Sequence, residues 1–417
     1  MTTFAALGLN KTLQANIKRL GYKEPTYIQE HSIGAVLSGT DTYAIAPTGT
    51  GKTAAYLLPT LQELSQTDNS EMHVRPIRGL YLVPTRELAQ QVHESINDYG
   101  KDLGLRTISI FGGVRIQSQT NRFKRGCDIV VATPKRLIDL VKKGVISLTH
   151  IEHFVMDEAD RLVSMGIVQE LRTIISSIPK TAQQVVFSAT DSKALAKFSS
   201  DNQRNVKVVK SSAKSPALTK IVHTMYRTFR DEKHKTLCRL LDLLDCDKAL
   251  IFVRTKNDVN HLTELLNNNG FTSTGLHNEI PQKKRQERLS AFKNGEVKYL
   301  VATDIVSRGI DIDDLYYVIN VDLPVNCNDY IHRVGRTART ANTRLRSKKD
   351  MQAKQDKQAQ SKAVAGKKHH DDYSAPTKQI ENIQGHVFSL VCPEQERLLP
   401  KIINAVGKDI KLEPLPW

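Results

Sequence analysis

The sequence predicts an α/β protein with two tandem sheets, each mostly parallel and flanked by helices. Two observations support this prediction. Short β-rich runs alternate with helical patterns along the chain, and the runs of the first half read as apolar throughout and not as alternating, which is typical of parallel strands covered on both faces. A chain of 417 residues is also long enough for two or three domains, each with its own core.

The first domain is predicted to span residues 1–207. We expect its strands at residues 43–45, 80–83, 109–111, 129–132, 154–156 and 185–187. From residue 208 to residue 219 the chain is polar and basic, contains Ser, Ala and Pro, and has no clear period. We therefore interpret this segment as a linker.

The second domain is predicted to span residues 220–417. Its strands are expected at residues 221–226, 250–253, 273–276, 299–301, 318–321 and 387–390. Open parallel sheets bind their ligands at the carboxyl ends of the strands, so two such sheets in tandem would face a cleft between them.

The composition is that of a cytoplasmic protein. No apolar stretch approaches the roughly 20 residues that cross a bilayer, and the N-terminus lacks the pattern of a signal peptide. No two of the five cysteines have metal-ligand spacing, so we expect reduced, packed thiols. The formal net charge of +16 indicates an anionic polymer as partner, with a solvated basic surface as the alternative.

A glycine-rich loop at residues 46–53 follows the first predicted strand. Its glycines can adopt positive φ and let successive backbone N–H groups converge on an anion, while a lysine reaches the β- and γ-phosphates and a threonine hydroxyl ligates magnesium. The helix expected to begin near the end of the loop adds its positive N-terminus. The predicted nucleotide-binding residues here are Thr48, Gly49, Thr50, Gly51, Lys52 and Thr53.

A second segment, which is acidic, follows the predicted strand at residues 154–156. It brings Asp157, Glu158 and Asp160 to the end of a buried strand. Burying these charges costs several kcal/mol unless a cation or a hydrogen-bond network compensates, and Mg²⁺ prefers such hard oxygen ligands. The alternative is an ordinary strand end with solvated acids.

With these segments in place, the chain resembles the DEAD-box ATP-dependent RNA helicases over nearly its whole length. The signature segments of that family occur in order at residues 21–29, 46–53, 84–89, 112–113, 133–137, 157–160, 188–190, 251–254, 303–311 and 332–339. The resemblance implies two tandem RecA-like domains with a nucleotide and RNA cleft between them. Phe-Gly-Gly-Val at residues 111–114 and the compact C-terminus are similar to the bacterial RhlE-like branch.

The resemblance also implies the first half of an ATP site that uses Mg²⁺. The amide of Gln29 would read the adenine edge by a bidentate pairing, with Phe4 and Tyr22 beside it. Asp157 would hold Mg²⁺ through water together with the hydroxyl of the phosphate loop. Glu158 would orient and deprotonate the attacking water.

The second domain would complete this site. Arg336 and Arg339 match the arginine fingers of the family, and Asp311 matches the ribose contact. Because Lys52 and Arg336 belong to different domains, we expect hydrolysis to require domain closure, which a second ligand can control. The residues that would couple nucleotide state to domain position are Asp160, Ser188, Thr190 and His332.

RNA is the second ligand that the resemblance implies. Its contacts would be Pro84, Thr85, Arg86, Gly113, Thr133 and Arg136 in the first domain, and Arg254, Gln282, Arg285 and Thr303 in the second. Hydroxyl, guanidinium and amide groups suit phosphate and sugar, so binding should depend on salt and ignore sequence. Lys135 replaces a glycine of the family pattern, and a positive φ there would cost lysine about 1 kcal/mol or more.

Three functions fit these residues. The first is a helicase that uses ATP hydrolysis to bend RNA and unwind short duplexes. The second is an ATP-gated RNA clamp that serves as a ribonucleoprotein assembly platform and unwinds little. The third is a DNA translocase with a related core, which the RNA-directed motif set disfavours. We expect a monomer, with a ribosome or ribonucleoprotein as a possible partner and no membrane.

Residues 341–384 form an insertion relative to the family pattern. This segment has ten Lys or Arg against five Asp or Glu and almost no large apolar residues, so we expect it to be disordered or partly helical and exposed. It is either a tolerated loop extension or an auxiliary arm that binds RNA.

The arm hypothesis predicts the effect of a deletion. Removing residues 341–384 should weaken RNA binding and flatten its salt dependence, because fewer phosphate contacts release fewer counterions. Basal ATPase activity should not change. RNA affinity measured over a salt series tests this, and unchanged affinity would contradict the arm hypothesis.

Overall fold

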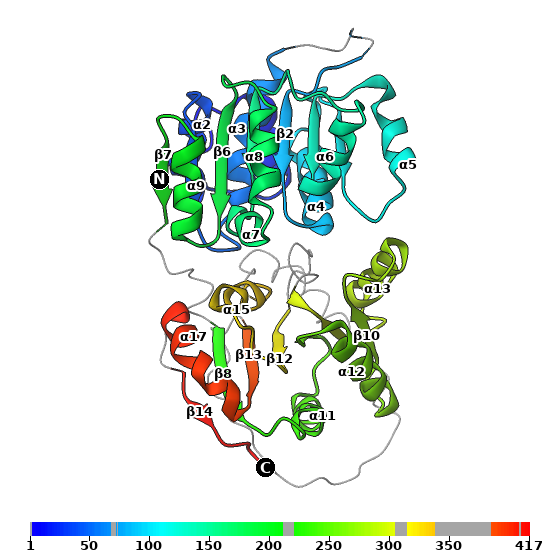
Figure 1. The fold of residues 1–417 in the computed structure, drawn as a ribbon. Coiled ribbons are helices and arrows are strands. Elements are labelled where there is room, and N and C mark those ends of the chain that lie inside the picture. The colour runs from blue at the N-terminus through cyan, green and yellow to red at the C-terminus, as the bar shows by residue number, and fades with distance from the viewer. Residues whose placement is uncertain are drawn as a thin grey trace, which may run out of the picture. The chain divides into compact units, whose positions relative to one another are not determined.

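The computed structural model describes residues 2–67, 72, 74–211, 221–304, 315–337, 385–407 and 410–417. These residues form two seven-stranded sheets with helices on their faces, which confirms the predicted α/β class (Figure 1). We call the compact parts built on these sheets the first unit and the second unit. The predicted insertion at 341–384 and residues 212–219 of the predicted linker lie outside the described residues.

The first sheet has the strand order β3-β4-β2-β5-β6-β1-β7, and every neighbouring pair is parallel. Its strands are β1 Thr42–Ile45, β2 Gly79–Leu82, β3 Thr107–Ile110, β4 Ile129–Ala132, β5 His153–Met156, β6 Gln183–Ser188 and β7 Lys207–Lys210. The helices are α1 Lys11–Arg19, α2 Tyr27–Leu37, α3 Lys52–Ser65, α4 Arg86–Tyr99, α5 Ile116–Thr120, η1 Asn121–Arg125, α6 Pro134–Lys142, α7 Ala159–Ser164, α8 Val168–Ser176 and α9 Lys193–Asn202.

The second sheet has the order β10-β11-β9-β12-β13-β8-β14. Its strands are β8 Ile221–Arg227, β9 Ala249–Phe252, β10 Ser273–Leu276, β11 Tyr299–Ala302, β12 Tyr317–Asn320, β13 Gly385–Val391 and β14 Leu412–Glu413. The helices are α11 Lys233–Leu244, α12 Lys256–Asn268, α13 Gln282–Asn294, α15 Cys327–Val334, η3 Pro393–Leu398 and α17 Leu399–Val406. Taken in chain order, the second sheet repeats the arrangement of the first, so that β8 takes the place of β1 and β12 the place of β5.

All predicted strands are present, but two edge strands were missed. Residues 208–210 belong to β7, so the predicted linker boundary at residue 208 is wrong. This strand pairs only with β1 and buries only Val209, so it has no continuous apolar run. The other missed strand, β14, has two residues.

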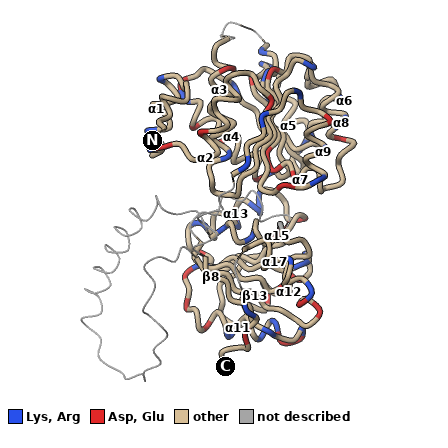
Figure 2. Tube along the Cα trace, turned by 90° about the vertical axis from the view of Figure 1, so that its left-hand side faces the viewer, with Lys and Arg blue, Asp and Glu red and all other residues tan. Residues whose placement is uncertain are grey.

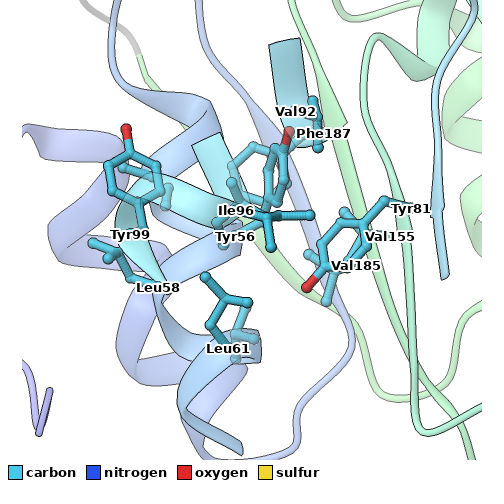
Figure 3. Close-up of a cluster of buried hydrophobic side chains, with 14 of the residues drawn as sticks. Tyr56, Leu58, Leu61, Tyr81, Val92, Ile96, Tyr99, Val155, Val185 and Phe187 are labelled. Atoms are coloured by element: carbon cyan, nitrogen blue, oxygen red, sulfur yellow. The ribbon is translucent and has the colours of Figure 1, made fainter. Parts of the chain in front are cut away.

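The apolar strands of the first unit bury side chains on both faces of the sheet. Successive side chains of a strand point to opposite faces, so Val155 packs on the side of α3 and α4, whereas Phe154 packs on the side of α6 and α8. Figure 3 shows the α3 side, where the Tyr56 ring contacts Phe187 with centroids 5.3 Å apart. Every position of β1, β2, β4 and β5 is buried, which explains why these strands show no alternating pattern.

Buried aspartates fix the amino ends of the strands. Asp128 accepts hydrogen bonds from Arg75, at 2.7 Å, and from the backbone N–H of Arg106, at 2.8 Å. Asp41 accepts from the backbone N–H groups of Gln184 and Arg204, at 2.8 and 2.7 Å. Both carboxylates are engaged in structural hydrogen bonds, so we do not place a functional site at the amino edge of the sheet.

His153 lies at the start of β5, and burial lowers its pKa to about 4. Its Nδ1 lies 2.9 Å from Gln183 Oε1. The Gln183 amide nitrogen already donates to the carbonyls of Val36 and Thr40, so the histidine is the donor.

A neutral buried histidine predicts loss of stability in mild acid. The folded-state pKa of His153 lies below the ordinary value, so its contribution is full above pH about 6.5 and is lost as pH falls toward 4. His153→Asn keeps the donor without the titration. Between pH 7 and pH 5 the wild type should lose about 2 kcal/mol more stability than this variant. Urea unfolding at both pH values measures the difference.

The exposed His31 on α2 provides the matched control. His31→Asn should leave the acid sensitivity of the wild type intact. Equal acid sensitivity of the wild type and His153→Asn would contradict the assignment.

Candidate functional site

Three loops of the first unit meet at one edge of the sheet. Strands β5, β6 and β1 are consecutive neighbours and parallel, so their carboxyl ends lie side by side. The glycine-rich loop follows β1, Asp157 and Glu158 follow β5, and Thr190 lies just beyond β6. The sheet thus brings together segments more than 100 residues apart in the sequence.

Side-chain donors hold the carbonyl groups of the glycine-rich loop. Thr26 Oγ1 donates to the Thr50 carbonyl at 2.7 Å, and Lys52 Nζ donates to the Ala46 carbonyl at 2.6 Å. Gly49 and Gly51 have φ of +77° and +86°, the left-handed region that favours glycine. No side chain caps the N-terminus of α3 at Gly51. The loop is therefore preshaped, and the first N–H groups of α3 are available to a phosphate.

Gln29 ties the start of α2 to this loop. Its Oε1 accepts from the backbone N–H of Thr26 at 2.9 Å, and its Nε2 donates to the Gly51 carbonyl at 3.1 Å. The side chain is fully buried. An amide offers two N–H groups and two lone pairs, so these two bonds use one of each. A Cβ on Gly51 would lie 2.3 Å from Gln29 Nε2, so this contact needs glycine.

Phe4 and Tyr22 lie in the hydrophobic core beside α1 and α4. Their rings meet edge to face with centroids 6.4 Å apart. The Tyr22 hydroxyl forms a 2.6 Å hydrogen bond with that of Tyr99. Phe4 is buried, so the structure gives it a packing role.

Asp157 is a buried carboxylate with a donor on each oxygen. The backbone N–H of Glu158 donates to Oδ1 at 2.8 Å, and the Tyr56 hydroxyl donates to Oδ2 at 2.9 Å. Burial raises the pKa of Asp157 to about 6, and the nearby Lys52 acts in the opposite direction. The charged form is thus only partly compensated by the protein.

Glu158 adopts a strained backbone conformation in a buried position. Its φ of 47° and ψ of 46° lie in the left-handed region, which costs a residue with a Cβ about 1 kcal/mol or more. Its Oε2 is buried and has no hydrogen-bond partner among the described residues. An unpartnered carboxylate oxygen at this place can accept a proton from a water molecule.

The Tyr56 hydroxyl interacts with both predicted magnesium ligands, because it donates to Asp157 and forms a hydrogen bond with the side chain of Thr53. A hydroxyl and one carboxylate suit Mg²⁺ that takes its other ligands from phosphate and water. In the described part of the chain, no group of three or more His, Cys, Asp or Glu side chains could hold a metal alone. The donor set therefore fits nucleotide-bound Mg²⁺.

The residues predicted to couple the nucleotide to domain position are hydrogen-bonded to one another. Thr190 Oγ1 donates to Asp160. Ser188 Oγ donates to the Thr190 carbonyl at 2.7 Å and accepts from its N–H at 3.1 Å. The loops after β5 and β6 are thereby joined into one network.

The predicted RNA contacts of the first unit follow β2, β3 and β4 at the same edge of the sheet. Thr85 caps α4 by accepting from the Leu88 N–H at 3.2 Å. Gly113 has a φ of +81°, and a Cβ there would lie 2.1 Å from Arg86 Nη1. The Arg86 side chain can therefore lie against this loop only because residue 113 is glycine. Pro84 precedes Thr85, and Thr133 is the N-cap residue of α6.

Arg136 and Lys135 lie in the first turn of α6. Arg136 is buried, and its guanidinium donates to Gln119 Oε1 at 2.6 Å and to the Val114 carbonyl at 3.0 Å. It braces the loop after β3. Lys135 lies in the first turn of α6 and is not among the described residues with positive φ, so the expected backbone cost does not arise.

The residues predicted for the second domain lie at strand ends and on helices. Arg254 and Thr303 follow β9 and β11, and α13 begins at Gln282 and contains Arg285. Basic residues recur along this helix, as Figure 2 shows. His332 lies on α15, and Arg336 Nε donates to its carbonyl at 3.4 Å. Asp311 and Arg339 lie outside the described residues.

Tyr56 was not predicted as a site residue. It occupies the first turns of α3, three positions after Thr53, and this spacing places both residues on the same helix face. From the sequence, an aromatic residue at this position is expected to lie in the core, and the Tyr56 ring does pack there. Only the structure shows that its hydroxyl reaches Asp157.

Comparisons with known proteins identify two family domains in the chain. The DEAD/DEAH box helicase family matches residues 26–198, and the helicase conserved C-terminal domain matches residues 232–341. The DEAD-box ATP-dependent RNA helicase CshA of Bacillus cereus is 36% identical over 339 residues, which are 81% of this chain and 63% of that protein. The ATP-dependent RNA helicase DeaD of Buchnera aphidicola is 37% identical over 336 residues, 80% of this chain and 55% of that protein. The chain thus spans about three fifths of the length of such relatives.

Solved structures share the fold. Mss116p bound to ssRNA and AMP-PNP aligns with a TM-score of 0.78 at 25% identity, covering 99% of this chain and 79% of that chain. Dbp5 of S. cerevisiae bound to RNA and ADP BeF3 has a TM-score of 0.78 at 24% identity, covering 100% of this chain and 96% of that chain. These likenesses confirm the two tandem RecA-like domains. Within the described residues, no helix has the length and apolar character needed to cross a membrane.

The Tyr56 contact predicts a magnesium-dependent effect. Tyr56→Phe keeps the packed ring and removes one of the two donors to Asp157. A hydrogen bond to a charged group contributes about 1.5–3 kcal/mol, so Mg²⁺-dependent nucleotide binding should weaken by about tenfold or more. Titration of a fluorescent nucleotide at several Mg²⁺ concentrations measures this, and in EDTA the variant should match the wild type.

Tyr81→Phe is the control for this experiment. Tyr81 is equally buried, but its hydroxyl bonds Thr60 at 2.6 Å instead of a carboxylate. It should therefore retain the Mg²⁺ dependence of the wild type. The same Mg²⁺ dependence in Tyr56→Phe would refute the positioning role.

Proposed function

Because the chain belongs to the DEAD/DEAH box helicase family, we propose that it is an ATP-dependent RNA helicase whose ATPase activity is stimulated by RNA. The observation that carries this proposal is the meeting of the phosphate loop, Asp157 with Glu158, and the Ser188–Thr190 network at one sheet edge. We place the two RecA-like domains at residues 1–211 and 220–417, which moves the first boundary to include β7.

The first domain would bind ATP with groups that are already in place. The N–H groups of the loop and of the α3 N-terminus would cradle the phosphates, and Lys52 would neutralise them. The free N–H and lone pair of the Gln29 amide would pair with adenine. Thr53 and Asp157 would hold Mg²⁺, which supplies positive charge to the phosphate oxygens when it is bound.

Glu158 would act on the attacking water. Its buried Oε2 has no protein partner among the described residues, so it can accept a hydrogen bond from water and take its proton as the bond to phosphorus forms. The hydrogen bond from the Glu158 N–H holds the Asp157 carboxylate against the backbone of Glu158.

The second domain would supply the remaining charge. Arg336 and Arg339 would reach the γ-phosphate as arginine fingers, and such fingers contribute about 10³ to 10⁵ in rate in related phosphoryl-transfer systems. Asp311 would bind the ribose. Hydrolysis would then need the two domains to close, and the Asp160–Thr190–Ser188 network, with His332 in the second domain, would transmit the nucleotide state.

RNA would bind to both domains and favour closure. In the first domain, Arg86 and the loop amides around Gly113 would contact phosphate, while Arg136 would hold their loop in shape. In the second, Arg254, Gln282, Arg285 and Thr303 would continue the path. Such contacts read the backbone and not the bases. Closure would bend one strand and separate base pairs locally.

The test is ATP hydrolysis with and without RNA. RNA should stimulate turnover, DNA should not, and Glu158→Gln should lower turnover by about 10² to 10⁴-fold because general-base catalysis is lost. Nucleotide binding should persist in this variant. Glu94→Gln on the exposed face of α4 is the matched control and should turn over normally.

Two outcomes would overturn parts of the proposal. Equal stimulation by RNA and DNA would remove the RNA specificity. RNA-stimulated ATPase without strand separation in a short-duplex assay would favour the clamp over the helicase.

A further inference from the structure

A cavity of about 470 Å³ opens at the carboxyl edge of the second sheet. Its lining includes residues that follow β9 and β12, together with parts of α11 and η3. Ligand pockets of proteins commonly have volumes of about 300–1,000 Å³, and parallel sheets bind ligands at this edge. None of the residues assigned to the ATP site lines it.

The cavity occupies the position that the ATP site occupies in the first unit. Strand β8 takes the place of β1 and β12 the place of β5. Lys233 is the first residue of α11, as Lys52 is of α3, and Asp322 follows β12 as Asp157 follows β5. The second unit therefore repeats the lysine and aspartate of the nucleotide pocket.

The floor of this cavity nevertheless cannot bind phosphate in the manner of the first unit. Lys233 Nζ donates to the Val321 carbonyl at 2.6 Å, to Asp322 Oδ1 at 2.8 Å and to Gln395 Oε1 at 2.9 Å, which uses its three protons. The residues between β8 and α11 are Thr-Phe-Arg-Asp-Glu and include no glycine. The lysine is thus a structural cation, and a phosphate must find other donors.

Three arginines on the rim supply such donors. Arg230, Arg254 and Arg397 line the cavity and are exposed. The lining carboxylates are largely engaged, because Asp322 pairs with Lys233, and Asp258 accepts from the Thr255 N–H at 2.9 Å and from its hydroxyl at 2.7 Å. Glu394 also lines the cavity. The rim therefore favours an anion.

An apolar wall accompanies these charges. Val253, Val325 and Leu398 line the cavity, and Val325 is 73% exposed. His234 also lines it, and burial lowers its pKa, so a neutral imidazole faces the ligand at pH 7. A phosphate donor set beside an apolar wall matches a nucleotide, which has an anionic group and a flat base.

We propose that this cavity is a nucleotide subsite that holds one residue of the RNA strand, with the phosphate at Arg230 and Arg397 and the base against Val325. The inference rests on the proposed function, because Arg254 joins the cavity to the expected RNA path. A free nucleotide has the same chemistry, but only an RNA strand would already be held at Arg254. The subsite is tolerant of sequence, since an apolar wall accepts any base.

The test is a series of oligouridylates lengthened by one nucleotide at a time, with affinity measured by fluorescence anisotropy. Wild-type affinity should rise in a step when the RNA becomes long enough to enter the cavity. Arg230→Glu and Arg397→Glu should each lose that step, lowering affinity for the longer RNAs by about tenfold, while affinity for the shorter RNAs stays near that of the wild type. Val325→Ser should lose a smaller part of the step.

Lys298→Glu provides a charge-matched control. Lys298 is exposed and precedes β11, at the opposite edge of the same sheet, so this variant should keep the step. Circular dichroism of each variant verifies that the second unit remains folded.

Three results would overturn the subsite. The first is an equal step in Arg230→Glu, Arg397→Glu and the wild type. The second is an equal loss of affinity for short and long RNAs in these variants. The third is binding of uridine monophosphate to the wild type but not to Arg230→Glu, without any competition with the longer RNAs, which would assign the cavity to free nucleotides. Absence of RNA binding by the wild type at every length would instead remove the proposed function itself.

Discussion

The carboxylate of Asp157 is buried at the end of β5, and the architecture of the first unit serves to hold it there. Its hydrogen bonds come from Tyr56 in the first turns of α3 and from the backbone that follows β5, so α3 must begin where β5 ends. The strand order β5-β6-β1 puts them there. Burial raises the pKa of Asp157 to about 6 despite the neighbouring Lys52, so the protein only partly compensates the negative charge of this carboxylate. This uncompensated negative charge makes the end of β5 a candidate site for a cation.

The second unit solves the same electrostatic problem in the opposite way. Burial would raise the pKa of Asp322, but Lys233 and the Arg254 N–H lower it below its ordinary value. Lys233 contacts Asp322 directly at 2.8 Å. In the first unit the equivalent lysine bonds the Ala46 carbonyl, in the loop that would receive phosphate. One lysine–aspartate pair has closed into a structural ion pair, and the other remains open to a ligand.

Most of the fold could be predicted from the sequence because both faces of each sheet are covered. Most inner strands are short and largely apolar, and all of the inner strands were predicted. Strand β7 was not predicted because it is an edge strand that buries only Val209, so its sequence contains no continuous apolar run. The site residues were found through short local motifs, and the structure brings those of the first unit to one edge. Local motifs do not reveal which atoms are already in use, as Arg136 and Phe4 show. The role of Tyr56 depends on a contact across 101 positions, which no local pattern reports.

Helix capping distinguishes the β1–α3 junction from the β2–α4 and β9–α12 junctions. At the start of α12, Thr255 and Asp258 form a reciprocal capping box, so side chains satisfy the N–H groups of that turn. At the start of α4, Thr85 does the same for Leu88. At the start of α3, Gly51 has no side chain to offer, and the N–H groups stay open. The start of α11, the counterpart of α3, also has no side-chain cap, but the loop before it contains no glycine and its Lys233 pairs with Asp322. The capped junctions at β2–α4 and β9–α12 present arginines, Arg86 and Arg254, which suit the phosphates of an extended strand.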